Sequence, residues 1–288
     1  MDSKLGRRTF VVTSLATGFA LAVSPVTAET VHTDSTGLVT GEIKIGEMPA
    51  YRAQPEGGAK FPLILVVPEI FGVHEHIKDV CRRLAKAGYM AIAPEVFARQ
   101  GDPTKMTDIN AIITNVVNKT PDEQVMKDLD ATVEWAKKSG KLDGDRVGIT
   151  GFCWGGRIVW LYCAHAGPGG APKAGAAWYG RLSNATNALQ SKTAIDVGAK
   201  LRAPVIGFYG GQDAGIPIGQ IEMMRRELAA NPKKVGGEII VYADAQHGFN
   251  ADYRPSYTKA AAEDAWAKML AFFQVGLRPS PSASPPVK

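Results

Sequence analysis

Short apolar runs alternate with longer segments of helical periodicity along most of the chain. The runs have the length and composition of strands that are buried on both faces of a sheet. We expect strands at 61–68, 89–93, 146–150, 174–178, 204–210 and 236–242, after a β-rich lead at 37–51. We expect helices at 75–87, 120–138, 157–165, 218–230 and 257–273. This alternation predicts one α/β domain with a mostly parallel wound sheet, helices on both faces, and ligands at the carboxyl ends of the strands.

The start of the second helix carries a local signal of its own. Thr120-Pro-Asp-Glu123 has the spacing of a capping box, with proline at the first helical position. The preceding residues, 100–118, are predicted to form a long loop.

A glycine-rich turn, Gly151-Phe-Cys-Trp-Gly-Gly156, separates the apolar run at 146–150 from the following helix. This G-x-C-x-G pattern is typical of a nucleophile elbow, where the chain turns so sharply that only glycine fits beside the exposed nucleophile. The amino end of the next helix would favour the thiolate form of Cys153. We therefore predict that Cys153 is a nucleophile. The alternative is a buried structural cysteine, a common state for this residue type.

Two further residues have the order that a nucleophile of this kind requires, first an acid and then a histidine. Asp213 follows the run at 204–210, and His247 follows the run at 236–242. Each alone has an ordinary explanation, a turn-forming aspartate or a satisfied polar histidine. Their order and their positions after successive strands predict a Cys153-His247-Asp213 triad at one edge of the sheet.

The loop after the first long strand supplies two more candidates. In this architecture the loop contributes a donor to the oxyanion hole, so the backbone N–H groups of Ile70 and Trp154 are predicted to point at one carbonyl oxygen. Glu69 would lie beside Cys153, where a carboxylate can take the thiol proton or hold the sulfur. The alternative for Glu69 is an exposed loop charge.

These residues together resemble the dienelactone hydrolase family, also called carboxymethylenebutenolidases. The motifs that carry the resemblance are Pro-Glu-Ile-Phe-Gly at 68–72, Ala-Pro-Glu-Val-Phe-Ala-Arg at 93–99, Gly-Phe-Cys-Trp-Gly-Gly at 151–156, Gly-Gln-Asp at 211–213 and His-Gly-Phe at 247–249. The resemblance spans roughly residues 37–275 and implies an α/β-hydrolase fold. It implies Cys153 as nucleophile, His247 as general base and acid, Asp213 as its orienting acid and Glu69 as the residue that controls the thiol. It also implies that Arg99 binds a substrate carboxylate.

One position departs from the family pattern. The family enzyme of chloroaromatic breakdown has a second carboxylate-binding arginine four residues beyond the histidine, and here that position is Ala251. Asn250 and Arg254 lie nearby in sequence. A lactone or ester with one anionic group, or with none, fits these residues. Tyr179 and Phe249 are candidates for lining the substrate site, although aromatic residues at a sheet edge are more often part of the core.

The predicted function is hydrolysis of a small-molecule lactone or ester through a thioester on Cys153. The runner-up is a broad-specificity carboxylesterase or thioesterase. Two other classes are a redox-active thiol protein and a non-catalytic exported binding protein. No metal or cofactor motif is found, so we expect neither. The formal net charge of +5 comes with dispersed basic pairs and gives no basis for nucleic-acid binding. We expect a monomer or a weak dimer.

The ends of the chain differ from its centre in composition. Residues 1–28 contain Arg7-Arg8, an apolar stretch and Val26-Thr-Ala28, which together predict a cleaved twin-arginine signal and export to the periplasm or medium. The stretch is too short for a membrane span, and the alternative is an uncleaved basic tail. Residues 29–277 form the predicted single domain, and the Pro/Ser-rich 278–288 is predicted to be disordered. Of the three cysteines, Cys81 and Cys163 are expected to be buried, either single or paired with each other.

Overall fold

The computed structural model describes residues 31–58, 60–168 and 170–279. The signal predicted at 1–28 and most of the predicted tail lie outside these residues. Within the described part of the chain, no helix is long and apolar enough to cross a membrane.

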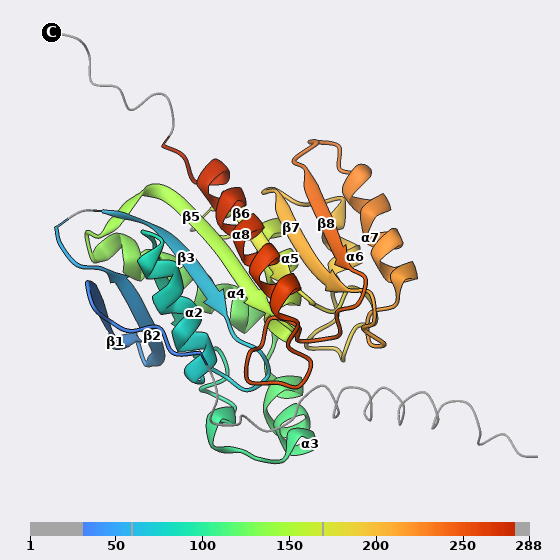
Figure 1. Cartoon of the computed structure of the whole chain (residues 1–288), viewed down its shortest axis with the longest axis horizontal. Helices are drawn as coiled ribbons and strands as arrows, with labels where there is room; N and C mark the ends of the chain where they lie inside the picture. The colour runs from blue at the N-terminus through green and yellow to red at the C-terminus, as the bar shows by residue number, and fades with distance from the viewer. Residues whose placement is uncertain (1–30, 59, 169, 280–288) are drawn as a thin grey trace, which may run out of the picture.

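Eight strands form one sheet in the order β1-β2-β4-β3-β5-β6-β7-β8. The strands are β1 Leu38–Ile45, β2 Met48–Pro55, β3 Phe61–Val67, β4 Met90–Pro94, β5 Leu142–Phe152, β6 Ala174–Trp178, β7 Val205–Gly210 and β8 Gly237–Tyr242. The pairs β1–β2 and β2–β4 are antiparallel, and all the others are parallel. The β-rich lead is thus an antiparallel hairpin at the edge of the predicted parallel sheet (Figure 1).

Helices cover both faces of this sheet. The helices are α2 Glu75–Lys86, α3 Ile109–Ala111, α4 Asp122–Lys138, α5 Trp154–Ala164, α6 Ala194–Gly198, α7 Ile218–Ala229 and α8 Lys259–Gly276. Side chains of α2 and α8 belong to one hydrophobic core, and those of α4, α5, α6 and α7 to another. Figure 1 shows α2 and α8 on the near face, with α4 and α5 behind the strands. The α/β fold class predicted from the alternation is therefore confirmed.

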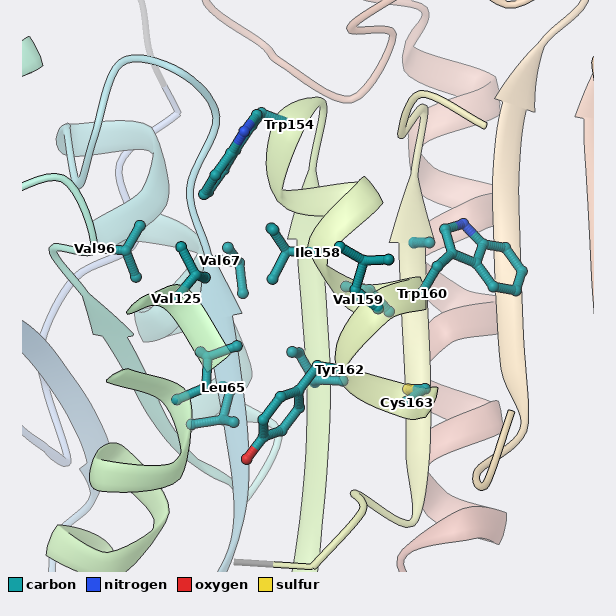
Figure 2. Close-up of a cluster of buried hydrophobic side chains, with 14 of the residues drawn as sticks. Leu65, Val67, Val96, Val125, Trp154, Ile158, Val159, Trp160, Tyr162 and Cys163 are labelled. Carbon is teal, nitrogen blue, oxygen red and sulfur yellow. The ribbon is translucent and has the colours of Figure 1, made fainter. Parts of the chain in front are cut away.

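The larger core fixes α5 against the centre of the sheet. Leu65 and Val67 of β3 are fully buried, and so are Ile158 and Val159 of α5. Figure 2 shows these side chains meeting those of α4 between the helices and the strands. Because α5 begins directly after β5, this packing holds the turn between the two elements in one position.

Two local predictions between residues 100 and 123 were wrong. The segment predicted as a loop contains short helical turns at Pro103–Lys105, α3, Ile112–Val116 and Val117–Lys119. No capping box forms, because the Thr120 hydroxyl donates to Val116 O at 3.0 Å and Glu123 pairs with Lys127. Pro121 takes the N-cap position instead, and α4 begins at Asp122.

The register of the parallel strands brings several loops together at one edge. Val67 pairs with Gly151 at the ends of β3 and β5, and Phe152 pairs with Trp178 at the ends of β5 and β6. The ends of β7 and β8 are likewise in register. The loops that carry Glu69, Cys153, Asp213 and His247 therefore all leave the sheet at this edge.

Candidate active site

Cys153 occupies the sharp turn between β5 and α5. Its backbone has φ 53° and ψ −114°, in a region that a residue other than glycine rarely adopts and that costs about 1–3 kcal/mol. Its N–H donates to Trp178 O at 3.0 Å, which ties the turn to β6. A Cβ at Gly155 would lie 2.4 Å from Val67 O, so the helix can approach β3 this closely only with glycine there. The sequence signal of the elbow therefore corresponds to an observed strained turn.

His247 and Asp213 meet across the loops that follow β8 and β7. His247 Nδ1 and Asp213 Oδ2 are 2.7 Å apart, with 12% and 2% of the side chains exposed. Burial alone would lower the pKa of His247, but the charge of Cys153 and then that of Asp213 outweigh burial and raise this pKa well above its usual range. The other oxygen of this carboxylate, Asp213 Oδ1, accepts a hydrogen bond from Gly215 N at 2.9 Å, which holds the Asp213 side chain in place.

Glu69 is buried in a polar cluster on the loop after β3. Its Oε2 accepts a hydrogen bond from the Tyr253 hydroxyl and lies 3.1 Å from Arg254 Nη2 and 3.7 Å from His74 Nε2. Burial tends to raise the pKa of Glu69, but the charge of Arg254 prevails and holds the pKa well below its usual range. Glu69 is therefore an ionised, fully buried carboxylate rather than an exposed loop charge.

The partners of Glu69 differ from what the sequence suggested. Among the described residues its hydrogen bonds and ion pairs go to Tyr253, Arg254 and His74, and none goes to Cys153. Tyr253 and His74 were not singled out from the sequence, and Arg254 was noted only for its closeness to the family arginine position. No periodic pattern marks them, because they lie on irregular loops whose approach to Glu69 is a property of the folded chain.

The three residues predicted to bind substrate differ in their surroundings. Both terminal nitrogens of Arg99 are bonded to the carboxylate of Asp128, at 2.7 and 2.8 Å, and half of the arginine side chain is exposed. Phe249 is fully buried and its ring packs on those of Tyr179 and Tyr242, so it is a core residue. Tyr179 is also fully buried, but its ring meets the edge of His247 at 5.1 Å.

The two predicted oxyanion donors lie on the loop after β3 and at the start of α5. Ile70 directly follows Glu69, and Trp154 is the first residue of α5. Neither backbone N–H takes part in a hydrogen bond within the described ranges. The Trp154 ring packs on Phe97 at 4.8 Å between centroids, which fixes the first turn of α5.

Both the sequence and the fold of the chain are similar to those of one enzyme family. The sequence profile of the Dienelactone hydrolase family matches residues 48–277, which is most of the chain. The chain belongs to the dienelactone hydrolase family. It is a carboxymethylenebutenolidase-like hydrolase, a class that acts on esters and lactones.

Relatives within this family are similar over nearly their whole length. A protein of Methylorubrum extorquens named "Putative carboxymethylenebutenolidase" is 57% identical over 278 residues, which are 95% of this chain and 94% of that protein. One of the same name from Escherichia coli K12 is 48% identical, over 92% of this chain and 97% of the relative.

Two solved structures whose names refer to dienelactone hydrolase share the fold. A crystal structure named "Putative Dienelactone Hydrolase" from Klebsiella pneumoniae has a TM-score of 0.78 and 49% identity, over 82% of this chain and 98% of that one. A dienelactone hydrolase-like promiscuous phosphotriesterase from metagenomic libraries has a TM-score of 0.67 at 20% identity, over 84% of this chain and 98% of that one. At this lower identity the likeness concerns the fold.

Proposed function

We propose that this member of the dienelactone hydrolase family cleaves a small-molecule lactone or ester through a covalent thioester on Cys153. The observation that carries the proposal is the strained elbow, which presents Cys153 at the amino end of α5 together with the buried His247–Asp213 pair. Cys153 and Asp213 raise the pKa of His247, which favours an imidazolium that can act as a proton donor in the reaction at the sulfur.

The first half of the reaction is attack by sulfur on the carbonyl carbon. The S–C bond forms while the carbonyl π bond opens to an oxyanion, which the N–H groups of Ile70 and Trp154 would receive. Removing one such donor typically costs about 3–4 kcal/mol of transition-state stabilisation. When the oxyanion collapses, the bond to the leaving oxygen breaks, and His247 gives that oxygen its proton.

The second half regenerates the enzyme. Neutral His247 takes a proton from water, the resulting hydroxide attacks the thioester carbon, and the C–S bond breaks to release the carboxylic acid and the thiolate. Asp213 holds the His247 ring in the orientation that both proton transfers need. The chemistry uses only groups of the chain, the substrate and water.

The buried ion pair of Glu69 supports a positioning role in addition to the predicted control of the thiol. Its ion pair with Arg254 holds the loop that carries the Ile70 N–H. We propose that Glu69 is a positioning residue for the oxyanion donor, and that its charge also opposes a second negative charge near the elbow.

The surroundings of Arg99 and the residue at position 251 bear on the range of substrates. Arg99 is bonded to Asp128, and the position of the second family arginine is the fully buried Ala251. Both features favour a range that includes neutral esters, so a broad carboxylesterase or thioesterase remains the second candidate. The signal predicted at 1–28 leads us to propose that the enzyme acts after export.

The test compares the hydrolysis of a dienelactone and of a neutral aryl ester by the wild type, Cys153→Ala and Asp213→Asn. We expect the cysteine variant to lose both activities and the aspartate variant to lose about a hundredfold or more in kcat/KM. Asp244→Asn, an exposed aspartate on the same loop as His247, is the matched control and keeps wild-type rates. Full activity in Cys153→Ala, or a wild type inactive on both substrates, would overturn the proposal.

A further inference from the structure

The loop after β6 brings an arginine to the elbow that the family motifs do not include. Tyr179 has φ 38°, so the chain turns sharply as it leaves β6. Gly180 then packs directly on the first turn of α5, because a Cβ there would lie 2.4 Å from Arg157 N. Trp178, two residues before Gly180, accepts the hydrogen bond from Cys153 N. Arg181 therefore leaves this loop beside the start of α5 and the nucleophile.

Arg181 differs from the other arginines near this edge of the sheet in the partners of its guanidinium. Arg99 is bonded to Asp128, Arg157 to Asp122 through both terminal nitrogens, and Arg254 to Glu69. Arg181 is exposed, and no hydrogen bond or ion pair of its guanidinium is found within the described part of the chain. An arginine without an acid partner at the mouth of a site can bind an incoming anion without first breaking an ion pair.

The electrostatic surroundings of Arg181 agree with this placement. The surrounding protein lowers the pKa of its guanidinium, although part of the side chain reaches solvent, and the charge of Cys153 acts in the opposite direction. The guanidinium is thus close enough to Cys153 for their charges to interact, and it is partly shielded from water. A charge-assisted hydrogen bond in such a place is stronger than one at an open surface.

We propose that Arg181 is a specificity-determining residue that binds an anionic group, a carboxylate in the first instance, of the substrate attacked by Cys153. This inference rests on the proposed function. The planar guanidinium can hold a carboxylate through two parallel N–H bonds. Such a contact would orient the scissile carbonyl toward the elbow and would supply the charge recognition that Ala251 cannot give.

The test uses two acetate esters that differ in one charge, 4-acetoxybenzoate and its methyl ester, with release of the phenol as the signal. For Arg181→Met we expect the ratio of kcat/KM for the anionic over the neutral ester to fall about tenfold or more, mainly through KM. Arg181→Lys keeps the charge and restores part of the ratio. In the wild type the ratio also falls as salt rises, because exposed charges are screened, and this dependence weakens in Arg181→Met.

The matched control is Arg226→Met, which removes the same charge from an exposed position in the last turn of α7 and leaves the ratio unchanged. An unchanged ratio in Arg181→Met, or a loss seen only in Arg99→Met, overturns the inference while the hydrolase function stands. If the wild type cleaves neither ester, or Cys153→Ala cleaves both, the proposed function fails and the inference fails with it.

Discussion

At the scale of single residues, the buried ion pair of Glu69 and Arg254 is the most demanding contact near the site. Both side chains are fully buried and their charged atoms are 3.1 Å apart. Arg254 also lies over the ring of Phe71, at 5.3 Å from its centroid. Removing one partner leaves a charge in a place where water cannot solvate it, and this is far more costly than replacing both.

Arg254→Met should therefore lower the free energy of unfolding by about 3–5 kcal/mol at pH 7. Glu69→Gln combined with Arg254→Met should recover a large part of that loss, because no unpaired charge remains. Urea unfolding of the wild type, both single variants and the double variant measures the coupling. Additive losses in the double variant would show that the two side chains do not stabilise each other.

At the scale of elements, Glu95 links the end of β4 to the turn that precedes α2. Its Oε2 accepts from Val73 N at 2.8 Å, and its Oε1 is buried without a hydrogen-bond partner in the described structure. Burial raises the pKa of Glu95 to about 7. The carboxylate also lines a cavity of about 440 Å³ together with Glu42 and Asp102. The negative charges of Asp102 and Glu42 raise the pKa of Glu95 further.

The sign of the resulting pH dependence follows from the raised pKa. The folded protein holds this proton more tightly than the unfolded chain, so stability falls as the pH rises from about 4.5 through about 7. Glu95→Gln keeps an acceptor for Val73 N–H and cannot ionise. We expect it to be more stable than the wild type by about 1–3 kcal/mol at pH 8.5, and to lose this advantage at pH 5. Thermal melts at both pH values measure the difference, and an equal difference at both would contradict this assignment.

The elements also show how far the sequence could lead. Central strands such as β3 and β7 were predictable because they are buried on both faces and their apolar runs are continuous. The capping box was not, since whether Thr120 bonds forward to the helix or back to Val116 depends on the preceding turn. Within the site, Cys153 carries a strong local signal in its glycines. Arg254, the ion-pair partner of Glu69, lies on an irregular loop far away in the sequence, and no local pattern predicts such a contact.

At the scale of the whole molecule, the sheet separates Cys81 from Cys163. Cys163 on α5 belongs to the core on one face, and Cys81 on α2 to the core on the other. All three cysteines are free, so of the two arrangements left open by the sequence the unpaired one holds. Burial raises the pKa of both Cys81 and Cys163, which keeps these thiols protonated and slow to react.

A thiol reagent should therefore distinguish Cys153 from the other two. Cys153 stands at the site edge with 5% of its surface exposed, whereas Cys81 and Cys163 are fully buried. We expect the native protein to react at one thiol, which is lost in Cys153→Ala, and the protein in guanidinium chloride to react at three. Addition of a reductant should leave Tm unchanged, because no disulfide contributes to stability. A drop in Tm on reduction, or a single reactive thiol after unfolding without reductant, would mean that Cys81 and Cys163 form a disulfide. Such a disulfide would require a different placement of α2 and α5, which lie on opposite faces of the sheet.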